Sequence, residues 1–124
     1  MIFDVDIVLR ERDYAVTERV VVPTAPPGPG GAPAEWTDAE VEQILKEILL
    51  AIDRIRNPAA ERRYVALRGF SWIVEPIAEG GVVIAIEIQS GAAVAGPFAI
   101  DQEVLARSIA RVLAAAAPLK PVVH

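Results

Sequence analysis

The sequence predicts one α+β domain, a two-layer sandwich in which an antiparallel sheet of four to five strands carries two helices on one face. Three observations predict it. Apolar and polar residues alternate along residues 2–9, a stripe of apolar residues at helical spacing follows residue 37, and the segments run in the order β-β-α-β-β-(β)-α. We place the domain at residues 1–117 and expect residues 118–124 to form a loose C-terminal tail.

The first two segments are predicted to form a β-hairpin. Residues 2–9 (IFDVDIVL) place Asp4 and Asp6 on one side and apolar residues on the other, which is typical of a strand with one buried face. Residues 14–22 (YAVTERVVV) are rich in β-branched residues, which favour strands. The charged residues 10–13 lie between these two segments and form the predicted turn.

Residues 23–35 (PTAPPGPGGAPAE) interrupt this pattern with five prolines and three glycines. Proline lacks a backbone N–H and has a fixed φ, so no helix or central strand is expected there. We predict a flexible loop that acts as a connector, with a functional loop as the alternative.

The first helix has the clearest start and end signals in the chain. Thr37 and Glu40 have the spacing of a capping box, and Trp36 and Val41 occupy the two positions of a hydrophobic staple. An apolar stripe at helical spacing follows. It consists of Val41, Ile44, Leu45, Ile48, Leu49, Ile52 and Ile55. Asn57-Pro58 is expected to end the helix, because the residue before a proline is pushed out of the α region.

The second half repeats the arrangement of strands followed by a helix. Residues 64–75 and 82–88 are predicted strands joined by a tight turn at residues 79–81, and residues 92–95 are a short fifth candidate. Segment 82–88 is apolar on nearly every position, so we expect a strand with neighbours on both sides. Asp101 is the predicted N-cap of a second helix, with Ile100 and Leu105 as its staple, and Pro118 follows its end.

Composition excludes several chemistries. The chain has no cysteine, and its one histidine is the last residue, His124, so neither a thiolate site nor a positioned histidine is available. The net charge of −5 argues against a nucleic-acid partner. No apolar run approaches the ~18 residues that cross a bilayer, and no signal-peptide pattern is visible. We therefore expect a cytoplasmic protein without a membrane partner, cofactor or metal.

One segment has the context of a phosphate-binding loop. Gly91 to Gly96 follows a predicted strand and precedes a predicted helix. However, Pro97 and Phe98 occupy the positions where such a loop needs a lysine and a hydroxyl residue. We therefore predict a small-residue turn or a short edge strand.

Two pairs of carboxylates are candidates for other chemistry. Asp4 and Asp6 lie on one face of a strand, about 7 Å apart, which suits a hard cation. Glu75 and Glu87 can face each other across the second hairpin, where burial would raise the pKa of a carboxyl and favour a general acid. Solvent-exposed acids or pairs with arginine explain both patterns more simply.

Basic residues gather in one segment, residues 54–68, where five arginines against one glutamate give +4 in an acidic chain. Guanidinium groups suit carboxylate or phosphate partners, so this segment is the candidate anion or partner contact. Its arginines are Arg54, Arg56, Arg62, Arg63 and Arg68. For the two that end the helix, the negative C-terminal end of its dipole is the alternative explanation.

The sequence leaves three classes of function open. The preferred one is a non-catalytic protein-interaction or assembly module that self-associates as a homodimer or binds another protein. Two helices cover one face of the sheet, and the other face would expose valine and isoleucine side chains. A second copy is the expected cover for that face, with the proline loop or a different protein as alternatives, and an open strand edge offers a second route to self-association by continuing the sheet between copies. The alternatives are a small-ligand or anion-binding domain that uses residues 54–68, and an enzyme that uses carboxylates alone. We expect no catalytic residue.

Overall fold

The computed structural model describes residues 1–22, 36–63 and 65–116, so the predicted proline-rich loop at 23–35 and the tail at 118–124 lie outside the described residues. The elements follow the predicted order β-β-α-β-β-β-α. They are β1 (Ile2–Leu9), β2 (Ala15–Val21), α1 (Asp38–Arg56), β3 (Ser71–Pro76), β4 (Val82–Ile88), β5 (Gly91–Phe98) and α2 (Gln102–Ala116).

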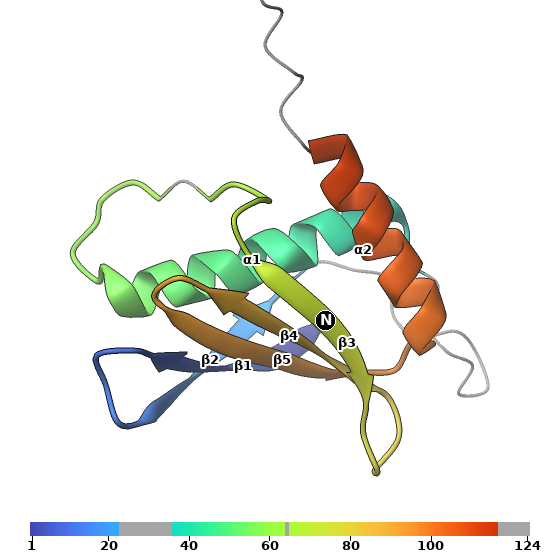
Figure 1. The fold of residues 1–124 in the computed structure, drawn as a ribbon, viewed down its shortest axis with the longest axis horizontal. Coiled ribbons are helices and arrows are strands. Elements are labelled where there is room, and N and C mark those ends of the chain that lie inside the picture. The colour runs from blue at the N-terminus through green and yellow to red at the C-terminus, as the bar shows by residue number, and fades with distance from the viewer. Residues whose placement is uncertain (23–35, 64, 117–124) are drawn as a thin grey trace, which may run out of the picture.

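The five strands form one antiparallel sheet in the order β2-β1-β5-β4-β3. Both helices lie on the same face of it, as predicted, and the two-layer α+β class is confirmed (Figure 1). Helix α1 packs against β1, β2 and β5, while α2 packs against α1 and β3. The side-chain amide of Gln102 donates to the Val74 carbonyl at 2.9 Å and ties the start of α2 to β3.

The predicted helix start is confirmed in detail. The Thr37 hydroxyl accepts from the Glu40 backbone N–H at 3.2 Å, and the Glu40 carboxylate accepts from the Thr37 N–H, which completes the capping box. The Asp101 carboxylate accepts in the same way from the Val104 N–H at 3.1 Å, so both predicted caps form.

The core lies between the helices and the sheet. Alternate residues of β1, the stripe of α1 and the inward residues of β4 and α2 are buried together. At one end, the Phe98 ring meets Phe3 and Trp36 edge-on, with ring centroids 5.0 Å and 5.4 Å apart. The residues of the core point to one face of the sheet, and no other part of residues 1–22, 36–63 and 65–116 forms a layer over the opposite face.

Two predicted strands have different limits in the structure. The strand predicted at 64–75 is wrong in its first half, because β3 begins at Ser71. Ser71 is paired with Glu87, next to the end of β4, so residues 65–69 extend beyond the strand that would pair with them. The short strand predicted at 92–95 is in fact the eight-residue β5, which pairs with β1 on one side and β4 on the other.

Candidate functional site

The uncovered face of the sheet, called the open face below, carries most of the exposed large apolar side chains of the described residues. Seven such side chains are more than about 40 % exposed, and five of them lie on this face. These five are Ile2, Val8, Val21, Ile73 and Val94. An exposed apolar cluster on one face marks an interaction surface, whereas single exposed apolar residues are ordinary.

Strand register joins three of these residues into one patch. Val94 on the central strand pairs with Ala85, and Ala85 pairs with Ile73 on β3. Val8 pairs with Ala92, which lies two residues before Val94. The alanines are small, so a hollow of about 300 Å³ lies between the larger side chains and Glu87. The centre of the open face is therefore apolar and uneven in height.

Charged residues surround this patch. Asp4 pairs with Arg19 at 3.5 Å, and Asp6 accepts a hydrogen bond of 2.6 Å from the Thr17 hydroxyl. Neither aspartate belongs to a group of three or more possible metal ligands within the described parts of the chain.

Glu75 and Glu87 do not face each other across the second hairpin. Glu75 pairs with Val83 and Glu87 pairs with Ser71, and both glutamates are exposed. The general-acid alternative depended on burial, which neither residue has.

The arginine segment does not form one cluster, because its members have different partners. Arg54 lies 3.4 Å from Glu18 on β2. Arg56 donates to the Ser90 hydroxyl at 3.0 Å, in the turn between β4 and β5. Arg62 and Arg68 are exposed and make no hydrogen bond or ion pair with the rest of the described chain.

Arg63 closes the C-terminal end of α1. Its guanidinium donates to the Asp53 carbonyl at 3.1 Å, to the Asn57 carbonyl at 2.9 Å and to the Asp53 carboxylate at 2.9 Å. The Asp53 carbonyl also accepts from the Asn57 backbone N–H at 2.7 Å, so Arg63 adds a second donor at the end of the helix, where carbonyls have few partners. Hydrogen bonds from the Asn57 amide and from Arg63 hold the pKa of the Asp53 carboxyl below its ordinary value, against the opposing effect of burial. This arginine therefore has a structural role.

The segment Gly91–Gly96 is neither a phosphate loop nor the predicted turn or edge strand, because it belongs to the central strand of the sheet. Pro97 is tolerated there because it lies in a bulge of β5, where Gly96 and Pro97 stand opposite the single residue Val83 of β4. A side chain at Gly91 would overlap the carbonyl of Val8, so glycine lets β5 approach β1 closely.

An ion pair joins the two helices. Arg111 of α2 donates to both carboxylate oxygens of Asp38 at 2.9 Å and 3.0 Å, and the Ser108 hydroxyl donates to the same carboxylate at 2.7 Å. These hydrogen bonds, first from Arg111 and then from Ser108, lower the pKa of Asp38 from 3.8 to about 2.

We expect the Arg111→Gln variant to be less stable than the wild type at pH 6 and nearly equal to it near pH 2. Because the pKa of Asp38 is lower in the folded state than in the unfolded state, the ionised Asp38 stabilises the fold above pH 3.8. This contribution to the free energy of unfolding disappears as the pH falls towards 2. Thermal unfolding followed by circular dichroism between pH 2 and 6 measures this difference. The control is Arg107→Gln, which removes an exposed pair 3.4 Å long on the same helix. If the difference in Tm between Arg111→Gln and the wild type stayed constant from pH 2 to 6, the Asp38–Arg111 ion pair would not be its cause.

Sequence reasoning missed two residues that the fold brings together at one end of the sheet. Arg10 follows β1 and Ser90 lies between β4 and β5, and the Arg10 N–H donates to the Ser90 carbonyl at 2.9 Å. Both residues line a pocket that also contains Arg56. Only the pairing of β1 with β5 places them side by side, and no local pattern indicates that pairing.

Comparison with protein-family models, with curated proteins and with solved structures finds no match for this chain. Among the residues that the structure describes, no helix is long and apolar enough to cross a membrane.

Proposed function

We propose that this chain is a non-catalytic assembly module, in which two copies associate through their open faces. The observation that carries the proposal is the concentration of exposed apolar side chains on that face, next to a core that is already complete on the other face. Contiguous apolar surface of this kind is typical of sites that bind another protein surface.

The dimensions of the open face suit a second copy. Five strands at a spacing of about 4.8 Å, each about seven residues long, give a face of roughly 24 Å by 23 Å. Two such faces bury roughly 1,100 Å² even when treated as flat, which clears the ~1,000 Å² expected of a specific interface.

The relief of the open face also suits a copy of itself. In a two-fold dimer the same patch occurs on both sides, so each raised feature needs a matching hollow on the same surface. Val94 and Ile73 stand beside the hollow over the alanines of β4 and β5, so one copy carries both parts. The row from Val94 through Ala85 to Ile73 contains no charged side chain, and two acidic residues lie directly beside it, Asp6 paired with Val94 and Glu87 paired with Ala92.

Continuation of the sheet across an edge is less favourable than face-to-face contact. The β2 edge carries Glu18 and Arg19, and the β3 edge has only six residues and ends in Pro76. Charged side chains, short strands and proline are the features that keep strand edges from pairing. On the open face, the apolar row from Val94 through Ala85 to Ile73 runs across three strands without a charged residue between them.

Light scattering coupled to size-exclusion chromatography tests the proposal. We expect the mass to rise from 13.3 kDa towards twice that value as the protein concentration increases through the micromolar range. The measurement is made in about 0.3 M salt, so that the acidic residues around the patch are screened. A mass of 13.3 kDa at every concentration would overturn self-association and would leave a different protein as the partner of the open face.

A further inference from the structure

The pocket at the end of the sheet is formed by four segments that are far apart in the sequence. It has a volume of about 490 Å³ and lies where β1 ends, where β4 turns into β5 and where α1 ends. Its lining residues are Leu9, Arg10, Glu11, Arg56, Gly69, Ile88, Gln89 and Ser90. This volume falls within the range of small-molecule sites, which combine an apolar surface with a few placed polar groups.

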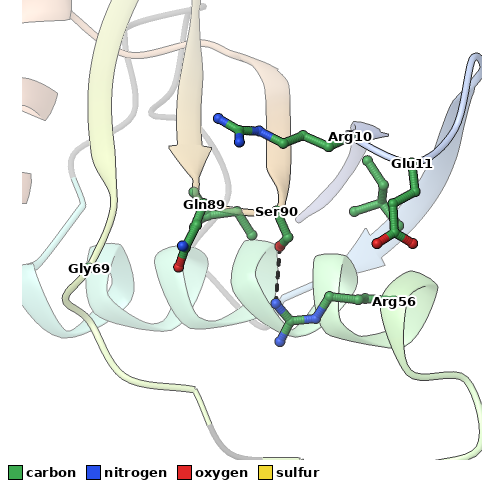
Figure 2. A pocket seen from close by; sticks show the side chains of 8 residues that line it. Arg10, Glu11, Arg56, Gly69, Gln89 and Ser90 are labelled. Atoms are coloured by element: carbon green, nitrogen blue, oxygen red, sulfur yellow. Dashed lines mark hydrogen bonds between the residues drawn. The ribbon is translucent and has the colours of Figure 1, made fainter.

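Two guanidinium groups reach this pocket from different elements. Figure 2 shows the Arg56 guanidinium reaching Ser90 from below, while the Arg10 side chain passes above Ser90 towards the adjoining ends of β4 and β5. The Ser90 hydroxyl accepts from the Arg56 guanidinium and positions it, while the Ser90 carbonyl accepts from the backbone N–H of Arg10 and fixes the backbone from which the Arg10 side chain extends. Leu9 and Ile88 supply the apolar part of the lining.

The guanidinium groups of the pocket are not fully paired with carboxylates of the chain, so they can bind an anion. Arg10 is exposed, and its side chain makes no hydrogen bond or ion pair with any described residue. Arg56 has one long ion pair, 3.6 Å from Asp53, and that aspartate is held more closely by Arg63. The lining thus has two guanidinium groups and one carboxylate, that of Glu11, in a chain whose net charge is −5.

We propose that this pocket binds a small aliphatic dicarboxylate. One carboxylate pairs with Arg10 and the other with Arg56, and the chain between them lies against Leu9 and Ile88. Guanidinium groups form paired hydrogen bonds with carboxylates, and their placement on opposite sides of Ser90 matches two separated anionic groups.

The end of α1 disfavours concentrated negative charge, so a singly charged carboxylate beside Arg56 is penalised less there than a phosphate group of charge about −2. Phosphate sites typically use the N-terminal end of a helix, where free N–H groups and the dipole attract negative charge. Here α1 contributes its last residue, Arg56, so its negative C-terminal end lies near the pocket. No aromatic side chain lines the pocket, so a nucleotide base would have no ring to stack on.

Titration of the ¹⁵N-labelled chain with three ligands of equal chain length tests this proposal. Adipate has two carboxylates, hexanoate has one and 1,6-hexanediol has none. In about 50 mM salt, we expect adipate to shift the amide signals of residues 9–11, 56 and 88–90 saturably, in the millimolar range or tighter. Hexanoate should bind about tenfold more weakly, and the diol should cause no saturable shift.

Variants assign the binding to the two arginines. Arg10→Gln and Arg56→Gln should each weaken adipate binding about tenfold or more. The matched control is Arg12→Gln, since Arg12 lies two residues from Arg10, is not part of the lining and has a side chain without a partner among the described residues. It should leave adipate binding unchanged.

Several results would overturn the proposal. These are the absence of saturable shifts at residues 9–11 and 88–90, equal affinity for hexanoate and adipate, tighter binding of inorganic phosphate than of adipate, or an equal loss in Arg12→Gln. The Arg10→Gln result is independent of folding, because the side chain is exposed and unpartnered within the described chain. Repeating the titration on the Val94→Glu variant separates this site from self-association, because Val94 does not line the pocket.

Discussion

Replacing Val94 by glutamate is expected to weaken self-association about 100-fold. Val94 lies on the central strand of the open face and is 42 % exposed, so in a two-fold dimer it is covered near the middle of the interface. Val94 is already more than half buried, so covering the rest of it contributes about 0.6 kcal/mol, and symmetry counts it twice, which gives about 1.2 kcal/mol or a factor of almost ten. Desolvating a glutamate at this position on both copies costs about 1.5 kcal/mol more in total, which brings the expected loss to about 100-fold.

Val104 provides the matched control for this substitution. It is also an exposed valine, at 48 %, but it lies in the first turn of α2 on the opposite side of the molecule from the open face. Val104→Glu should keep the wild-type dissociation constant, measured by sedimentation equilibrium or light scattering. Equal effects of the two substitutions, or no effect of Val94→Glu, would show that the copies do not meet through the open face.

Most of the fold could be predicted from local chemistry. The helix limits followed from Thr37, Asp101 and Asn57-Pro58, whose capping and stop signals act within four residues and are therefore visible in sequence. The two faces of the sheet followed from alternation along residues 2–9 and 82–88. These features depend on neighbours along the chain, so a single sequence contains them.

The central position of β5 could not be predicted in the same way. Its sequence, GAAVAGPF, has little β propensity, and it is a strand because β1 and β4 lie on either side of it. Small residues at this position permit close approach, but their spacing also fits a turn. Pairing between residues 4–9 and 91–96 is a property of the tertiary structure, so the local pattern does not reveal it.

The candidate site was predicted in part for the same reason. The valine and isoleucine residues of an uncovered face followed from alternation and from the number of helices. Residues 54–68 were the candidate anion or partner contact, but the fold directs Arg54, Arg56 and Arg63 to three different partners. The pocket that contains Arg56 takes its second arginine from the end of β1, more than 40 residues earlier in the chain.

Two isoleucines on paired strands separate the folding core from the association surface. Ile84 on β4 is fully buried, with no exposed area, whereas Ile73 on β3 is 52 % exposed on the open face. Ile84→Ala removes buried methyl groups and leaves a cavity, which should lower the free energy of unfolding by about 3 kcal/mol. For a chain of this size, that corresponds to a fall in Tm of about 12 °C.

Ile73→Ala is the control for Ile84→Ala, because it should affect self-association and leave the stability of the fold nearly unchanged. It should change Tm by no more than about 2 °C, because an exposed side chain contributes little to folding, yet it should weaken self-association about tenfold by removing apolar contact area on both copies. Thermal unfolding is measured in the Val94→Glu background, so that dimer formation does not contribute to stability. Association is measured by light scattering in the wild-type background. A large loss of Tm in Ile73→Ala would mean that the open face is part of the folding core, and unchanged association would exclude Ile73 from the interface.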